Sequence, residues 1–156
     1  MENLFRMYNI RGVYPTEINE KFAYKLALSF SEYMGIFNKV VVGRDGRISG
    51  KELKSSLIKG FLDCGKNVFD LDLVPTPIVH YYVLKNKVFG ACITASHNPP
   101  NWNGFKFFNK DGSHCFYGNG LEKVKKYFLK EVKPLSNKGN LENVQDFINE
   151  YINEIL

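Results

Sequence analysis

Features that would define a class of protein at once are scarce in this sequence. Its 156 residues include three cysteines, which stand far apart, form no C-x-x-C pair and have no histidine at zinc-ligand spacing. We therefore expect Cys64, Cys92 and Cys115 to be reduced, mostly buried thiols, as is usual in the cytoplasm. No apolar run is long enough to span a bilayer, and the first residues lack the pattern of a signal peptide. These absences favour a cytoplasmic protein with no membrane partner.

The common signatures of nucleotide-binding and hydrolytic sites are also missing. The sequence contains no P-loop, no G-x-G-x-x-G fingerprint and no G-x-S-x-G elbow. Its composition is that of an ordinary globular protein, with 44% hydrophobic and 24% charged residues, and it excludes a disordered or collagen-like chain. The length predicts one domain, or one domain plus a tail. A chain of this length buries roughly 70% of the surface that its unfolded form exposes, so we expect a substantial core.

The net charge of +5 and the isoelectric point near 9.0 permit a nucleic acid, a membrane surface or an anionic small molecule as partner. The lysines are spread along the chain, and the densest cluster, Lys123, Lys125 and Lys126, falls on a predicted helix. Such a cluster is more typical of a solvated helix face than of a nucleic-acid stripe. A nucleic-acid-binding role therefore rests on charge alone, and we expect no nucleic-acid partner.

Helical and strand patterns alternate along the chain. Phe22, Leu26 and Phe30, for example, recur at a helical spacing, and Gly35 stands where that helix would end. The patterns predict helices over residues 19–34, 50–64, 77–86, 119–131 and 142–155, and strands over residues 39–42, 67–74, 88–94 and 104–109. The alternation predicts an α/β fold, a three-layer αβα sandwich around a mixed, largely parallel four-stranded sheet.

Two loops follow predicted strands and are candidates for a binding site, because ligands of such sheets bind beyond the carboxyl ends of the strands. Residues 94–104 place Ser96 at a strand end beside His97 and Asn98, which suits nucleophilic or phosphate chemistry. Lys106 can return toward this loop from the next strand. The alternative is a simple turn, which Ser before Asn-Pro often builds.

The second loop covers residues 43–50 and holds Arg44, Asp45 and Arg47. The two arginines can bind phosphate, with Asp45 orienting one of them, or they can form a purely structural Arg–Asp pair. A third basic segment around Arg11, near the N-terminus, can equally be an ordinary turn.

Six short blocks occur in a fixed order along the chain. They are F-R-M-Y-N-I-R-G at 5–12, V-G-R-D at 42–45 followed by Arg47 and Ser49, P-T-P at 75–77, T-A-S-H-N-P at 94–99, N-G-F-K at 103–106 and D-G at 111–112. The series resembles the α-D-phosphohexomutase superfamily, and within it the N-terminal domain (domain I) of the phosphomannomutase/phosphoglucomutase branch. The resemblance implies that residues 1–135 form domain I and that residues 136–156 are a linker and a helix leading toward a second domain absent from this chain.

The resemblance implies a mutase that interconverts hexose 1-phosphates and 6-phosphates through a phosphoserine and a bisphosphorylated sugar. Ser96 matches the phosphoserine, and its phosphate would be one ligand of Mg²⁺, whose carboxylate ligands would come from the absent domain. The implied activator is glucose 1,6-bisphosphate or a similar compound, and the implied partners are hexose phosphates and the remaining mutase domains, in cis or in trans. The isolated chain is expected to have little turnover. The alternative is a stand-alone phosphosugar-binding or regulatory module.

The same match assigns roles to further residues. His97, Lys106 and Arg11 match catalytic positions, and Tyr8 matches a position close to bound sugar. Arg44, Asp45 and Asn98 match positions that support the loops from behind. One departure lies within the matched blocks, because Asn9 stands where the family usually has Asp, so any charge pair of that Asp with Arg11 is not expected here.

Overall fold

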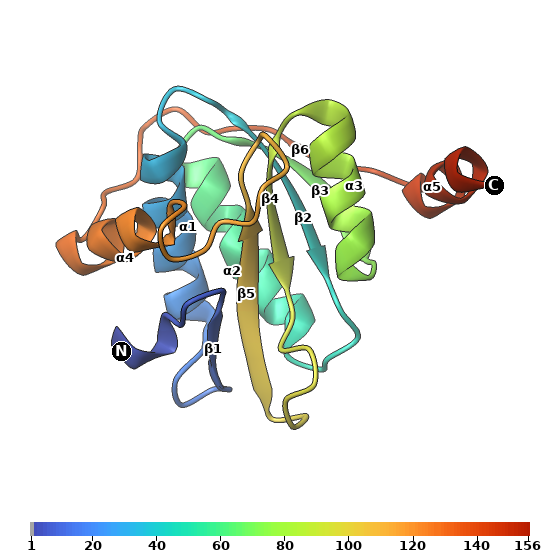
Figure 1. Ribbon diagram of the computed structural model, residues 1–156. Coiled ribbons are helices and arrows are strands. Elements are labelled where there is room, and N and C mark those ends of the chain that lie inside the picture. The colour runs from blue at the N-terminus through green and yellow to red at the C-terminus, as the bar shows by residue number, and fades with distance from the viewer. Residues whose placement is uncertain (1) are drawn as a thin grey trace.

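The computed structural model describes residues 2–156 and holds one six-stranded sheet with helices on both faces (Figure 1). The strands are β1 (Ile10–Val13), β2 (Lys39–Arg44), β3 (Asn67–Leu73), β4 (Phe89–Ile93), β5 (Trp102–Phe108) and β6 (Leu141–Asn143). The helices are α1 (Glu20–Met34), α2 (Gly50–Asp63), α3 (Thr76–Asn86), α4 (Leu121–Lys130) and α5 (Phe147–Ile155), preceded by a 3₁₀ turn, η1 (Glu2–Leu4). The expected α/β sandwich is confirmed.

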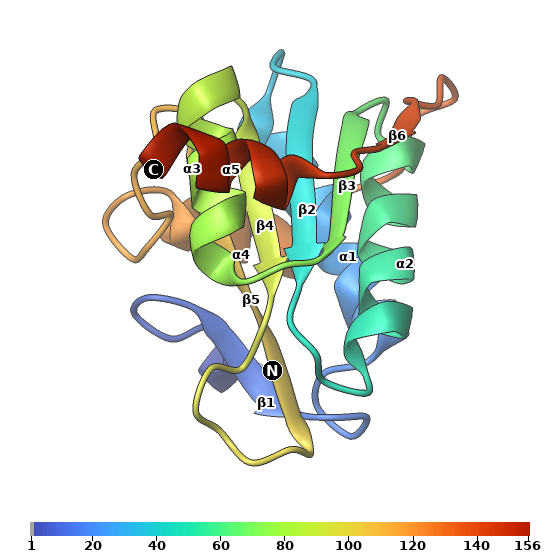
Figure 2. The ribbon, with the colours of Figure 1, turned by 90° about the vertical axis from the view of Figure 1, so that its right-hand side faces the viewer.

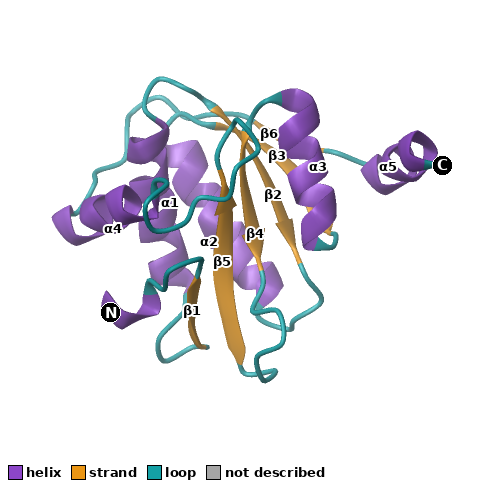
Figure 3. Ribbon diagram, viewed as in Figure 1, coloured by secondary structure: helices purple, strands orange, loops and turns teal. Residues whose placement is uncertain are grey.

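The sheet order is β1-β5-β4-β2-β3-β6. Strands β4, β2, β3 and β6 run parallel, while β5 is antiparallel to both β4 and β1. The sheet is therefore mixed and largely parallel, as expected. As a result, the connections that follow β2 and β4 leave the sheet at the same end (Figure 3).

The expectation of four strands is wrong, because the two edge strands were missed. β1 contains Arg11 and Gly12 and has no run of β-branched residues, and it forms a strand through its pairing with β5. β6 consists of Leu141, Glu142 and Asn143, all exposed, so it has no buried apolar pattern to detect. The helix expected over 142–155 consequently begins at Phe147, after this strand.

Two apolar layers hold the helices onto the sheet. On one face, α1, α2 and α4 cover a core in which Phe30 stacks on Phe107, with ring centroids 4.2 Å apart. On the other face, α3 packs through Val79 and Val83 against Cys92 and Phe108. Figure 2 shows the two layers on opposite sides of the strands. Successive side chains of β2 and β4 face the two cores in turn, which explains why these strands are apolar at nearly every position.

The C-terminal segment also packs against this domain. β6 pairs with β3, and α5 buries Phe147 against Tyr82, with ring centroids 4.8 Å apart. Lys85 of α3 forms ion pairs with Glu150 and Glu154 of α5. The domain boundary expected near residue 135 stays a prediction. Within residues 2–156, none of the helices is both long enough and apolar enough to cross a bilayer.

Helix α2 lies unusually close to α1 at Gly60. A β-carbon added there would meet the Ala27 Cβ at 2.6 Å and the Tyr24 carbonyl oxygen at 2.7 Å. We predict that Gly60→Ala destabilises the fold, because overpacking typically costs about 1–3 kcal/mol, against a gain of at most about 1 kcal/mol in helix propensity. Urea unfolding measures the difference. Gly46→Ala is the control, because nothing lies within 4 Å of its added β-carbon; equal losses in the two variants would contradict the prediction.

Candidate active site at the carboxyl ends of β2 and β4

The loop after β4 presents Ser96 to solvent. Thr94 and Ala95 are buried at the strand end, whereas Ser96 and His97 are exposed. Ser96 has a φ of 53°, in the left-handed region that is uncommon for residues other than glycine. Its backbone N–H donates to the Thr94 hydroxyl at 3.0 Å, and Asn98 N–H donates to the Ala95 carbonyl at 3.0 Å. Ser96 is thus the second residue of a hydrogen-bonded turn.

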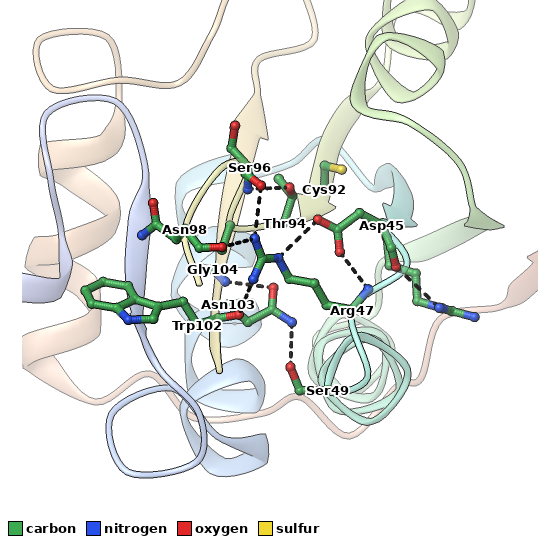
Figure 4. A network of polar contacts seen from close by, with 12 residues as sticks. Asp45, Arg47, Ser49, Cys92, Thr94, Ser96, Asn98, Trp102, Asn103 and Gly104 are labelled. Atoms are coloured by element: carbon green, nitrogen blue, oxygen red, sulfur yellow. Dashed lines mark hydrogen bonds and ion pairs between the residues drawn. The ribbon is translucent and has the colours of Figure 1, made fainter. Parts of the chain in front are cut away.

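The side chain of Arg47 donates hydrogen bonds to the backbone carbonyls of this loop. Its Nη2 donates to the carbonyls of Ser96 at 2.9 Å and Asn98 at 2.8 Å, and its Nη1 to those of Pro99 at 2.7 Å and Trp102 at 3.0 Å (Figure 4). Only 12% of this side chain is exposed. A guanidinium carries five N–H donors in one plane, which explains how one residue serves four carbonyls. Of the two open interpretations of Arg47, the structure therefore favours the structural one.

Asp45 orients Arg47. Its Oδ1 accepts from the Arg47 backbone N–H at 3.2 Å, and its Oδ2 lies 3.6 Å from Arg47 Nε. The Asp45 N–H in turn donates to the Ile93 carbonyl at 3.0 Å, so the loop after β2 is tied to the end of β4. Asp45 therefore contacts both Arg47 and the end of β4.

A buried amide fixes the far end of the loop. Asn103 is fully buried, and its Nδ2 donates to the Ser49 hydroxyl at 2.8 Å, while its Oδ1 accepts from the Gly104 N–H at 2.9 Å. Gly104 itself faces β1 so closely that an added β-carbon would lie 2.1 Å from the Ile10 carbonyl oxygen. Asn103 and Gly104 therefore lock the loop against α2 and β1.

Arg11 reaches the same loop from β1. It pairs with Gly104 in the sheet, and its Nη1 donates to the Ala95 carbonyl at 2.7 Å. Burial lowers the pKa of its guanidinium, and the nearby charges of Arg47 and Arg6 lower this pKa further. Within the described residues, Arg11 Nε and Asn9 Oδ1 are buried without a hydrogen-bond partner. Asn9 thus supplies no charge to offset that of Arg11.

The other predicted residues lie at different distances from the turn. Lys106 is half-buried on β5 and pairs with Cys92, two residues before Thr94, so it flanks the strand end. His97 follows Ser96 directly. Tyr8 is exposed, and its ring packs 5.9 Å from that of Phe116.

The remaining predicted residues support the two loops. Asn98 contributes its backbone carbonyl to Arg47. Arg44 turns away from the serine loop, because its Nε donates to Asp72 Oδ1 at 3.0 Å, and Asp72 also binds Lys54. The structure therefore brings Arg11 and Asp45 into the network around the turn but leaves Arg44 beside the end of β3. Asn103 was missed as an anchor, although its block in the sequence marks it.

The surroundings of Ser96 are cationic. Arg6 and Arg47 lie close enough to Arg11 to lower its pKa, with Asp45 as the opposing charge, and the Arg6 guanidinium lies 5.6 Å from the centre of the Trp102 ring. Among the described residues, no group of three or more His, Cys, Asp or Glu side chains is placed to hold a metal ion. This part of the chain thus suits a phosphate group better than a free cation.

Residues 2–131 match the family described as phosphoglucomutase/phosphomannomutase, alpha/beta/alpha domain I. The chain belongs to this family. It is 38% identical over 154 residues to a phosphopentomutase of Thermococcus kodakarensis, covering 94% of this chain and 33% of that protein. It is 45% identical over 108 residues to a phosphomannomutase/phosphoglucomutase of Pseudomonas aeruginosa, covering 67% of this chain and 23% of that protein.

The fold of this chain is also similar to that of a solved structure from the family. A phosphoglucomutase/phosphomannomutase family protein of Burkholderia thailandensis superposes with a TM-score of 0.86 at 30% identity, covering 99% of this chain and 35% of that one. The chain therefore spans about a third or less of the length of these relatives.

The Asn103–Ser49 hydrogen bond allows a test of the loop anchor. Asn103→Ala and Ser49→Ala should each destabilise the fold by about 1–3 kcal/mol, because each leaves a buried polar partner unsatisfied. The double variant should lose less than the sum of the two, since both partners are then gone. Denaturant unfolding of all four proteins gives the coupling. Strict additivity would show that the two side chains do not interact.

Proposed function

We propose that this chain is the phosphoserine-bearing part of a phosphohexomutase of the phosphomannomutase/phosphoglucomutase type. Such an enzyme moves a phosphoryl group between the 1- and 6-hydroxyls of a hexose by way of Ser96. The observation that carries the proposal is the geometry of the turn: Ser96 is exposed in a left-handed conformation while four carbonyls of its loop are held by Arg47. A serine fixed in this way can carry a phosphate without being buried.

The proposed transfer balances within the site and the substrate. The bond from phosphorus to Ser96 Oγ breaks and a bond from phosphorus to a sugar hydroxyl oxygen forms. The hydroxyl proton passes by way of the Lys106 amine to Ser96 Oγ, which leaves as a hydroxyl. The charge on the moving group is stabilised by Arg11, whose guanidinium already lies against the turn. His97 donates to the phosphate or the sugar oxygen, and Tyr8 contacts the bound sugar. The bisphosphorylated sugar then turns, and its other phosphate returns to Ser96.

The residues near Ser96 do not themselves form a magnesium site. Mg²⁺ prefers carboxylate and phosphate oxygens. The one carboxylate in the network, Asp45, is engaged by Arg47, and the other charged neighbours are cations. A phosphate on Ser96 would supply one ligand, and the carboxylates would have to come from outside this chain. When bound there, the ion would neutralise charge on the phosphate.

The substrates are proposed as hexose phosphates, with glucose 1,6-bisphosphate or a similar compound as activator. The names of the relatives cover pentose, glucosamine, glucose and mannose phosphates, so they do not choose among sugars. Because the chain spans about a third of these relatives, the remaining domains, in cis or in trans, would complete the cleft, and the isolated chain would turn over little substrate. We propose a cytoplasmic location.

Phosphorylation of Ser96 tests the proposal. Incubation with glucose 1,6-bisphosphate should add the mass of one phosphoryl group to the intact chain, and peptide mapping should place it on Ser96. Ser96→Ala should abolish the gain. Ser136→Ala, which changes an exposed serine outside the loop, should leave the gain unchanged.

Two other outcomes would count against the proposal. Phosphate on a different serine would exclude Ser96 as the carrier. No phosphorylation of a folded chain, even after the remaining domains of a family member are added in trans, would reject a mutase role. Binding of hexose phosphates under those same conditions would instead support a phosphosugar-binding module.

A further inference from the structure

The turn at Ser96 contains one peptide group whose orientation matters for a phosphate on that residue. Ala95 to Asn98 form the turn, closed by the hydrogen bond from Asn98 N–H to the Ala95 carbonyl. Its central peptide joins Ser96 to His97. In β-turns this central peptide has two alternative orientations, which differ by a rotation of about half a turn and define the paired turn types. One orientation directs the carbonyl outward, and the other directs the N–H outward.

Arg47 selects one of these orientations. The Ser96 carbonyl accepts from Arg47 Nη2 at 2.9 Å, so it is directed down into the protein. A peptide group is planar, and in its trans form the carbonyl and the N–H point in opposite directions. The His97 N–H therefore points away from Arg47. Figure 4 shows the Ser96 hydroxyl on that same side of the loop, opposite the guanidinium.

The other carbonyls that Arg47 binds follow Ser96 along the loop. Those of Asn98 and Pro99 precede Pro99 and Pro100, which have no N–H to offer, so this stretch supplies no competing donors. Ser96 N–H is already engaged by the Thr94 hydroxyl. Among the described residues, the His97 N–H has no protein acceptor, which leaves this N–H free to donate to a group on Ser96.

We propose that Arg47 is a positioning residue that holds the Ser96–His97 peptide with its N–H outward, so that this N–H donates to a phosphate on Ser96. The inference rests on the proposed role of Ser96 as phosphate carrier. Released from Arg47, the peptide would be free to rotate and would place a carbonyl oxygen against the phosphate dianion. Arg47 thus acts on the phosphate through the His97 amide and not by direct contact.

The test uses the full chain with phosphoserine installed at position 96 during translation, so it does not depend on phosphorylation by a sugar phosphate. Phosphorus and ¹⁵N–¹H NMR follow a pH titration. With Arg47 in place, the second pKa of the phosphoserine should lie below its ordinary value of about 6, because the His97 N–H and the nearby arginines stabilise the dianion. The His97 amide proton should shift downfield with the same midpoint.

Arg47→Lys should reduce the lowering of the phosphate pKa and should end the pH-dependent shift of the His97 amide proton. Lysine keeps the charge but has its three donors on one nitrogen, so it lacks the planar fork that serves the four carbonyls. The second pKa of the phosphate should then rise toward its ordinary value of about 6, although Arg6 and Arg11 still act on it, and the His97 amide should no longer follow it. Arg44→Lys is the matched control, because Arg44 contacts no carbonyl of the serine loop and its replacement should leave both titrations in place.

The outcomes separate the two proposals. The inference is overturned if the His97 amide does not follow the phosphate titration in the phosphoserine chain that retains Arg47. This measurement does not depend on whether Arg47→Lys folds. A folded Arg47→Lys variant with unchanged titrations overturns the inference as well. Failure of glucose 1,6-bisphosphate to phosphorylate Ser96 would instead count against the proposed function and leave the NMR result standing.

Discussion

Four hydrogen bonds from one guanidinium hold the candidate site together. Arg47 comes from the connection between β2 and α2, and its acceptors come from the connection between β4 and β5. Without this side chain, four carbonyls would lose these hydrogen bonds, two of which are partly buried. The left-handed backbone at Ser96 is stable in this setting because Arg47, Thr94 and Arg11 each bond to the turn.

The sheet topology explains why distant segments meet at this turn. β2 and β4 are parallel neighbours, so their following loops emerge side by side. β5 returns antiparallel to β4 and carries Asn103 and Lys106 back past the same end. β1 then adds Arg11 on the far side of β5. The antiparallel strands therefore bring basic residues to a site whose serine and supporting loop belong to the parallel part of the sheet.

The sequence predicts the interior elements well and the edges poorly. The helix expected over 19–34 is observed as α1, because Asn19 caps Phe22 N–H and Gly35 ends the helix, both of which are local signals. β1 was expected as a possible turn, since it forms only by long-range pairing with β5. The role of Arg47 was open for a related reason: the same spacing suits an arginine that binds phosphate and one that forms a structural pair with Asp45. The four hydrogen bonds from Arg47 to loop carbonyls favour the structural role.

The most direct test of this account is a crystal structure of the chain carrying phosphoserine at position 96. The account predicts that the phosphate lies on the exposed side of the turn, within hydrogen-bonding distance of the His97 N–H, while Arg47 keeps its contacts to the carbonyls of Ser96, Asn98, Pro99 and Trp102. A structure in which Arg47 leaves those carbonyls to bind the phosphate itself would contradict it.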